Sequence, residues 1–371
     1  KVRGSYTEVG NSYGRFMTTV TYPYDEQTQN WTSTSSYPNT KLKPERTKSW
    51  EVGLDARILN DISLNLTYYR SNTYNQTFYA DLSLSSGYSN IPIQSGNIMN
   101  EGIEMALGYN KQWKDFSFNT NYTLTWNKNR VKRLADGVYN YATGQSIQMP
   151  ELSPLTYGHT DARLILRVGG SMGDVYGQRL LKRDLNGYIL NEEGVGLTME
   201  NKETYLGSIL PKMNMGWSLG FGYKGVNLGM TFTGRFGGIV ISETQSVLDA
   251  AGVSKVSADV RDAGGVQINQ GKVSAQTYYQ AIQGTAAYYT YSATNVRLGE
   301  LSLSYTLPKK WFDNKVGMTV GLVGKNLWMI YCKAPFDPEL TTSAASNFYQ
   351  GFDAYMLPST RNFGFNIKFQ F

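Results

Sequence analysis

Large apolar residues alternate with small or polar residues at the end of this chain. In RNFGFNIKFQF (361–371) every odd position from Phe363 to Phe371 carries a large apolar side chain. The even positions between them hold Gly364, Asn366, Lys368 and Gln370. A period of two places the two sets on opposite faces of a β-strand. Chain ends are normally frayed and polar, whereas this one is predicted to be an ordered strand.

The same alternation recurs along most of the sequence. It is clearest in WEVGLDARI (50–58), FSFNTNYTLTW (116–126) and MNMGWSLGFGY (213–223). Together with the final strand, the pattern predicts ten strands, the remaining six lying near 1–9, 62–79, 96–110, 226–241, 300–307 and 315–331.

The connections between these strands are alternately short and long. The short ones are 59–61, 111–114, Gly225 and 308–314, and the long ones lie near 10–45, 80–95, 130–212, 242–293 and 332–357. Long structureless loops are rare in compact soluble domains. Outer-membrane β-barrels combine short periplasmic turns with long extracellular loops, and their strands alternate lipid-facing and lumen-facing residues. The pattern therefore predicts an all-β protein whose strands belong to a transmembrane antiparallel β-barrel. A soluble sandwich or barrel, which needs no apolar outer band, is the alternative.

Two of the short turns carry tryptophan beside lysine. Trp113 lies between Lys111 and Lys114, and Trp311 follows a pair of lysines in PKKWFDN (308–314). Aromatic rings next to ammonium groups suit a membrane–water boundary. Each tryptophan alone is also compatible with an ordinary exposed turn, but the same grouping at two turns on one side favours an aromatic girdle.

Composition agrees with a β-protein and excludes several other classes. The chain holds 28 Tyr, 15 Phe, 7 Trp and 38 Gly among 371 residues, which favours strands and turns. No apolar run approaches the roughly 18 residues of a transmembrane helix. The net charge of +6 is spread along the chain, so no nucleic-acid patch is expected. Cys332 is the single cysteine, which excludes a disulfide framework and a thiolate metal site.

Residue types that carry catalysis are scarce. His159 is the only histidine, and a lone histidine in a polar segment is usually a surface or hydrogen-bonded residue. GRFGG (234–238) continues a strand instead of opening a helix, so it is not a phosphate loop. Glu192 and Glu193 are adjacent, but nothing gathers them around a substrate. No catalytic residue, metal ligand or cofactor is predicted, and the protein is not expected to be an enzyme.

The segment 130–212 contains two further features. Asn186-Gly187 between two apolar arms predicts a type I′ hairpin. Acidic residues around it are similar to a calcium loop, but Gly187 comes too early for an EF-hand. ARLILRVGG (162–170) is a candidate extra strand, and if it spans the membrane the alternation of short and long connections breaks.

Eight segments, in order along the chain, are similar to a known family. They are LKPERTKSWEVGLD (42–55), SGNIMNEGIEMALGY (95–109), GDVYGQRL (173–180), GRFGG (234–238), NVRLGELSLSYTLP (295–308), VGKNLWMI (323–330), FDPEL (336–340) and LPSTRNFGFNIKFQF (357–371). Through these motifs the chain resembles the SusC/RagA-like TonB-dependent transporters of Bacteroidetes-type outer membranes. Because the segments cover the chain from end to end, the resemblance is more specific than any single motif.

The resemblance implies a barrel of 22 strands, of which residues 1–371 supply the later, C-terminal ten-strand portion. The plug domain, the TonB-contacting segment and the first strands precede this portion in the family. Lys1 is not an initiator Met and 1–7 already reads as a strand, so we expect a piece of a longer chain. Phe371 looks like part of the barrel-assembly signal and of the periplasmic girdle.

The function implied is TonB-dependent active import of oligosaccharides or oligopeptides across the outer membrane of a Gram-negative, Bacteroidetes-type bacterium. The implied partners are a SusD-like surface lipoprotein that forms a lid, the TonB complex and outer-membrane lipid, with a dimer of transporter–lid pairs as an option. Long loops are expected outside the cell and the C-terminus in the periplasm. The alternatives are a passive porin-like channel and a soluble extracellular β-sandwich that binds ligand.

The last long connection is the expected substrate-binding site. SNFYQGFDAYM (346–356) combines aromatic faces for a sugar ring or peptide with polar groups that fix orientation. The expected site residues are Asn347, Phe348, Tyr349, Gln350, Phe352, Asp353 and Tyr355. Gly351 allows the backbone to turn sharply between them. Alternatively, these aromatic rings pack against neighbouring loops and close the top of the barrel.

Overall fold

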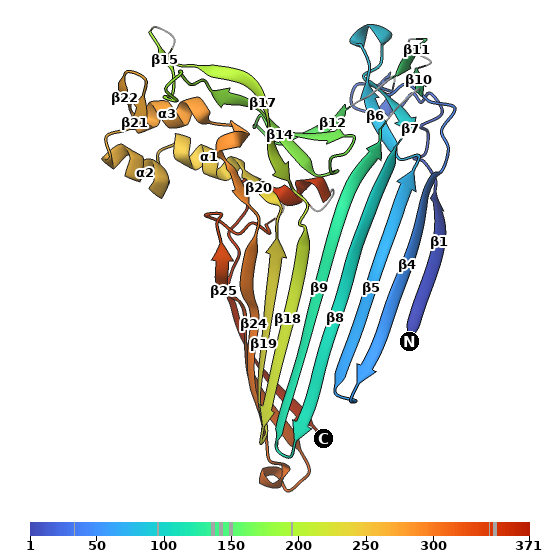
Figure 1. The fold of residues 1–371 in the computed structure, drawn as a ribbon, viewed down its shortest axis with the longest axis vertical. Helices are drawn as coiled ribbons and strands as arrows, with labels where there is room; N and C mark the ends of the chain where they lie inside the picture. The colour runs from blue at the N-terminus through green and yellow to red at the C-terminus, as the bar shows by residue number, and fades with distance from the viewer. Residues whose placement is uncertain are drawn as a thin grey trace.

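One ten-stranded antiparallel sheet dominates the structure, a computed structural model (Figure 1). The structure describes residues 1–32, 34–94, 96–134, 138–140, 144–147, 151–193, 196–340, 342–343 and 347–371. In spatial order the sheet contains β1 (Val2–Asn11), β4 (Glu45–Ile58), β5 (Ile62–Tyr74), β8 (Asn97–Trp113), β9 (Phe116–Arg133), β18 (Met213–Tyr223), β19 (Val226–Phe236), β24 (Asn295–Leu307), β25 (Gly317–Cys332) and β27 (Asn362–Gln370). All ten predicted strands are confirmed, and β1 and β27 are the two edges.

The short and long connections lie at opposite ends of this sheet. The short turns and the C-terminus lie at the lower end in Figure 1, and the other elements gather at the upper end. Leu59 and Asn60 both have positive φ, as do Lys224 and Gly225. Two successive residues with positive φ give a turn the same twist as its flanking strands, which permits the tight hairpins. The predicted asymmetry of the connections is confirmed.

The remaining elements form small sheets and helices at the upper end. The strands are β2 (Tyr24–Asp25), β3 (Asn30–Trp31), β6 (Thr77–Asp81), β7 (Asn90–Gln94), β10 (Val138–Asn140), β11 (Gln145–Ile147), β12 (Glu151–Thr156), β13 (Arg163–Arg167), β14 (Asp174–Leu181), β15 (Asn191–Glu192), β16 (Gly196–Leu197), β17 (Met199–Ser208), β20 (Ile239–Ser242), β21 (Val266–Ile268), β22 (Gly271–Val273), β23 (Thr290–Ser292) and β26 (Phe352–Asp353). The helices at this end are η1 (Leu84–Ser86), α1 (Glu243–Ala250), α2 (Lys255–Asp262), α3 (Ala275–Ile282), η2 (Ala286–Tyr288) and η4 (Asn347–Gly351), whereas η3 (Lys309–Phe312) lies in the short turn between β24 and β25 at the lower end (Figure 1). Within the described parts of the chain, none of these helices combines the length and apolarity needed to span a bilayer.

Two predicted strands are too long. The strand expected over 62–79 divides into β5 and β6 at Asn75, whose φ is +56°. The strand expected over 226–241 divides into β19 and β20 at Gly237 and Gly238, whose φ values are +77° and +84°. Left-handed backbone ends the extended conformation, so in each case the second part leaves the large sheet and joins a smaller one.

The segment 162–170 does not cross the membrane. Its strand β13 belongs to a separate four-stranded sheet in the order β12-β13-β14-β17. Leu164, Ile165 and Leu166 are at most 4% exposed, because this sheet packs against the other upper elements. The alternation of short and long connections therefore holds.

The predicted hairpin at Asn186-Gly187 is present, but its turn type was wrong. Arg183 forms an antiparallel bridge with Ile189. Gly187 has a φ of +84°, whereas Asn186 does not have the positive φ that a type I′ turn requires. The Asp184 carboxylate accepts hydrogen bonds from the backbone N–H groups of Asn186 and Tyr188, at 2.9 Å each. These hydrogen bonds favour a turn in which Gly187, and not Asn186, has a positive φ.

Strand register places the apolar residues on one face of the large sheet. At one height, Leu66 of β5, Met105 of β8, Leu124 of β9 and Met215 of β18 are successive cross-strand partners. The next residue along each strand is polar, namely Thr67, Glu104, Thr125 and Asn214. In the last pair of strands, the odd-numbered Phe365 and Ile367 pair with Leu322 and Val320. The predicted face of the final strand is thus confirmed by its register.

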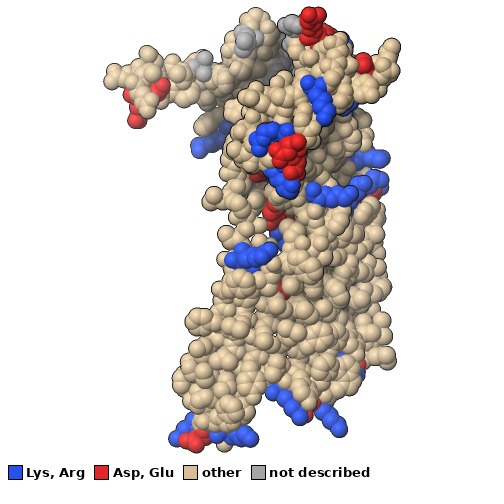
Figure 2. Space-filling view, turned by 90° about the vertical axis from the view of Figure 1, so that its left-hand side faces the viewer, with Lys and Arg blue, Asp and Glu red and all other residues tan. Residues whose placement is uncertain are grey.

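The apolar face has the height of a bilayer core and an aromatic rim at each end. From Phe116 to Trp126, β9 rises about 33 Å, or roughly 25 Å along the membrane normal at the usual strand tilt. Trp113 stacks on Phe116 at 5.7 Å, and Trp311 is 61% exposed at the same end, where the aromatic girdle is predicted. Figure 2 shows a face on which charges gather at the lower tip and the upper part, with few between. The sheet is therefore part of a transmembrane barrel.

A buried ion pair anchors the connection after β25. Arg297 of β24 binds the two carboxylate oxygens of Asp337 at 2.7 and 3.0 Å, and one oxygen of Glu339 at 3.2 Å. The Arg297 and Asp337 side chains are only 11% and 9% exposed. Burial opposes ionisation of Asp337, but the hydrogen bonds and the charge of Arg297, together with the hydrogen bond from the Glu339 backbone N–H, outweigh it and lower the pKa of Asp337. The FDPEL motif (336–340) thus ties this loop to the barrel wall.

Candidate functional site

The segment expected to bind substrate forms η4 and β26, and most of its aromatic rings surround Tyr157. Phe352 is 2% exposed and its ring lies 5.3 Å from that of Tyr157. The Tyr349 ring meets the Tyr157 ring edge-on at 6.2 Å. The Phe348 carbonyl accepts a hydrogen bond of 2.8 Å from the Tyr157 hydroxyl. The three rings therefore belong to one cluster with Tyr157.

The polar members of this segment are dispersed. Asp353 is 5% exposed and accepts a hydrogen bond of 2.6 Å from the Ser242 hydroxyl. Tyr355 is 59% exposed, and its hydroxyl donates to Glu243 at 3.3 Å. Gln350 is also exposed. The side chain of Asn347 lies outside the described part of the chain. This packing matches the alternative of rings that close the barrel top, and the substrate-binding role stays a prediction.

A second site lies where β9 and β18 separate. The ladder between them ends at Trp126 and Met213, although β9 continues to Arg133. Above this point the β9 backbone bonds instead to Lys212 and to the 169–170 turn. A pocket of about 860 Å³ lies between these two sets of backbone hydrogen bonds. Its walls are β9, the 169–174 turn, the end of β17 and the links 210–212 and 237–239.

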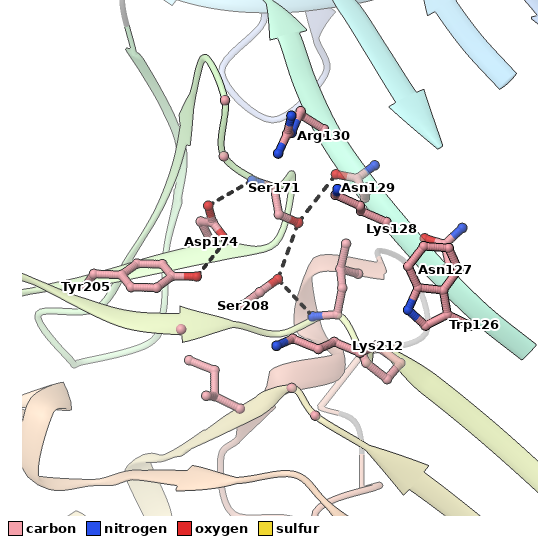
Figure 3. A pocket seen from close by; sticks show the side chains of 18 residues that line it. Trp126, Asn127, Lys128, Asn129, Arg130, Ser171, Asp174, Tyr205, Ser208 and Lys212 are labelled. Atoms are coloured by element: carbon pink, nitrogen blue, oxygen red, sulfur yellow. Dashed lines mark hydrogen bonds between the residues drawn. The ribbon is translucent and has the colours of Figure 1, made fainter. Parts of the chain in front are cut away.

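Hydroxyl and amide groups form a network across this pocket (Figure 3). The Ser208 hydroxyl donates to that of Ser171 at 3.3 Å, which in turn donates to Asn129 at 3.4 Å. Asp174 accepts hydrogen bonds from the Ser171 N–H at 2.8 Å and from the Tyr205 hydroxyl at 3.1 Å. Sequentially distant segments are thereby held together at one place.

Basic side chains outnumber acidic ones in the lining of the pocket. Arg130 and Lys212 lie on opposite sides of the hydroxyl network, and Lys128 lies beside it (Figure 3). Asp174 is the one acidic residue among the described residues that line the pocket, and burial raises its pKa although its hydrogen bonds act in the other direction. Burial also raises the pKa of Tyr205 to about 12, so its hydroxyl keeps its proton at neutral pH.

The pocket can therefore bind a polar ligand with anionic groups by hydrogen bonds and charge. It offers no arrangement for acid–base or nucleophilic catalysis, since its one carboxylate is bonded to Tyr205 and Ser171. Within the described residues, no group of three or more His, Cys, Asp or Glu could hold a metal ion. The sequence patterns did not predict this pocket, although Asp174 of the GDVYGQRL motif (173–180) and Gly237 and Gly238 of the GRFGG motif (234–238) line it.

Known proteins with similar sequences are TonB-dependent receptors. The sequence model of the family "TonB dependent receptor-like, beta-barrel" matches residues 1–327. TonB-dependent receptor P3 of Formosa agariphila is 25% identical, and the match covers 100% of this chain and 39% of that protein. TonB-dependent receptor SusC of Bacteroides thetaiotaomicron is 28% identical over 132 residues, which are 35% of this chain and 12% of that protein.

Solved structures show the same fold. The structure of the RagAB peptide importer in the open-open state is similar with a TM-score of 0.69 and 20% identity, covering 99% of this chain and 39% of that one. The structure of the RagAB peptide transporter gives a TM-score of 0.70 and 19% identity, covering 99% and 40%. The chain thus spans about two fifths of the proteins it matches along its whole length. These relatives confirm the resemblance to SusC/RagA-like proteins, and because the family model covers most of the sequence, the chain belongs to the TonB-dependent receptor-like β-barrel family.

Proposed function

We propose that the whole protein imports oligosaccharides or oligopeptides actively across the outer membrane. A SusD-like lipoprotein would act as the lid, and the TonB complex would supply energy through a plug domain. The main support is the apolar face of the ten-stranded sheet, which continues in register from strand to strand in a chain of this family. The named relatives agree, since one is SusC and others are described as a peptide importer.

We infer the compartments of the two ends of the barrel from the lengths of the connections. Outer-membrane barrels have short turns on the periplasmic side. The C-terminus and the turns at Leu59–Asn60 and Lys224–Gly225 would then be periplasmic, and the upper sheets and helices extracellular. The lid would cover this extracellular end, and two transporter–lid pairs would associate as a dimer.

Two alternatives are less well supported. A soluble β-sandwich buries its apolar faces between two sheets, whereas Phe363 and Phe365 here remain 80% and 77% exposed on an edge strand of a single sheet. A passive porin-like channel would show the same strands, and energy dependence distinguishes it from an importer.

The exposed part of the 347–355 segment is the proposed contact with cargo. Tyr355 offers an open ring face, and Gln350, five residues earlier, is also exposed. The partly buried Phe348 and Tyr349 and the buried Phe352 and Asp353 would support these two residues from beneath. Asn347 keeps its predicted role as a polar contact.

Uptake in cells tests both parts of this proposal. We expect import of labelled oligosaccharides or oligopeptides by the whole protein to stop when TonB is deleted, because a plugged barrel needs energy to open. We expect Tyr355→Ala to weaken cargo binding several-fold, as truncation of an aromatic contact commonly does. Tyr188→Ala is the matched control, since Tyr188 is 48% exposed in another loop.

Each result has a contrary outcome. Uptake that continues without TonB contradicts active import and favours the porin. Equal cargo affinity in the Tyr355 and Tyr188 variants excludes the segment as a contact without touching the transport proposal.

A further inference from the structure

Basic residues follow the upper border of the apolar face. Arg70 of β5 is the cross-strand partner of Trp50 and Glu101, and Glu101 is the partner of Lys128. One row higher, Lys48 of β4 and Arg130 of β9 occupy the corresponding positions. Arg46 lies two residues before Lys48 on β4. These residues are together called the basic belt, which consists of Arg46, Lys48, Arg70, Lys128 and Arg130.

The belt points outward. Lys128 and Arg130 have the same parity on β9 as Trp126, Leu124 and Tyr122, which belong to the apolar face. No register shift interrupts the pairing of β4, β5 and β8, so the parity of Arg46, Lys48 and Arg70 follows from the same ladder. The belt therefore lies just above the bilayer core, at headgroup height.

Carboxylates neutralise only part of this charge. Glu8 lies 3.2 Å from Arg46 and 3.6 Å from Lys48, and Glu101 lies 3.8 Å from Lys128. Such exposed pairs are weak. Among the described residues, no carboxylate oxygen comes within ion-pair distance of Arg70 or Arg130. Five cations against these two carboxylates leave an excess of three positive charges.

An apolar groove lies below the belt on the same face. It measures about 470 Å³ and is lined by Ile62, Leu107, Tyr109, Thr120, Tyr122 and Trp217. The Trp217 indole N–H donates to Thr120 at 2.9 Å, which leaves the ring available as an apolar wall. Along β9, Tyr122 lies about 20 Å below Lys128. One amphipathic molecule can therefore reach both places.

We propose that the basic belt binds the phosphate group of an outer-leaflet lipid, whose acyl chain lies in the groove below. The planar guanidinium fork of Arg70 or Arg130 matches phosphate oxygens, which accept two parallel hydrogen bonds from it. Lys128 and Arg130 also line the pocket beside Ser171 and Ser208, whose hydroxyls suit a sugar-bearing headgroup. This lipid site is distinct from the proposed cargo contact at 347–355, because the belt has the parity of the lipid-facing residues.

Lipid binding to the purified whole protein tests this inference. Native mass spectrometry would measure binding of lipid A, dephosphorylated lipid A and phosphatidylglycerol in detergent, with inorganic phosphate as a competitor. The test variant is Arg70→Gln with Arg130→Gln. The control is Lys202→Gln with Lys255→Gln, which removes the same charge from extracellular side chains that are 63% and 85% exposed.

We expect the belt variant to bind phosphorylated lipid about tenfold more weakly, because a hydrogen bond to a charged group is lost. The control should bind like the unmodified protein, and dephosphorylated lipid A should bind weakly to all three. Comparison of lipid A with phosphatidylglycerol identifies the source of the phosphate. Equal lipid binding by the belt variant, equal binding of the dephosphorylated lipid, or displacement by inorganic phosphate at the lipid's own concentration would overturn the proposal.

Discussion

Replacing Leu219 by arginine is expected to lower the free energy of unfolding of the barrel by about 2–4 kcal/mol. Leu219 lies in the middle of β18, opposite Thr120 of β9 and Met230 of β19, on the apolar face. A guanidinium at the bilayer midplane loses its hydration, and the nearest water lies about half a bilayer away. Urea unfolding of the whole protein in lipid vesicles measures the difference.

The neighbouring Ser218 provides the matched control. Its cross-strand partners are Asn121 and Thr231, so it belongs to the polar face. Ser218→Arg adds the same side chain, but it points into the lumen, and we expect a much smaller loss. If both variants lose the same stability, β18 does not have one lipid face and one lumen face.

Replacing Arg297 by alanine is expected to cost about 3–5 kcal/mol, because it leaves a buried carboxylate without its partner. Asp337 is 9% exposed, and the two guanidinium bonds to it, at 2.7 and 3.0 Å, are the ones lost. Glu339 would remain nearby and add like-charge repulsion. Heat-induced unfolding, followed by gel mobility, measures the stability.

Lys325→Ala is the control on the same pair of strands. Lys325 of β25 lies 3.7 Å from Glu300 of β24, but both side chains are largely exposed, at 63% and 44%. An exposed pair contributes at most about 1 kcal/mol. Equal losses in the Arg297 and Lys325 variants would mean that the Arg297–Asp337 pair does not anchor the loop.

The barrel strands were predictable because their signal is local. In β18 the alternation is contained in eleven consecutive residues, and the bilayer imposes it on every strand in the same way. The strand ends were less predictable. Residues beyond Asn75 and Gly238 remain extended after they leave the large sheet, so their composition alone does not distinguish a barrel strand from a strand above it.

The sites depend on contacts that no local pattern encodes. The pocket network joins Asn129, Ser171 and Ser208, which come from three separate segments. The aromatic residues around 348–352 were easy to find, but Tyr157, nearly two hundred residues earlier, occupies the faces of their rings. Whether an aromatic side chain has a free face depends on such a distant partner.

In this structure the ten strands cross a bilayer with alternate residues facing lipid. The most direct test is a cysteine scan of residues 213–223 in the whole protein, with Cys332 replaced by serine. Each cysteine would be assayed for reaction with a water-soluble thiol reagent and, after spin labelling, for contact with a lipid-dissolved quencher. We predict lipid contact at 215, 217, 219 and 221 and reaction with the aqueous reagent at 216, 218 and 220. The same response at both sets of positions would contradict the account.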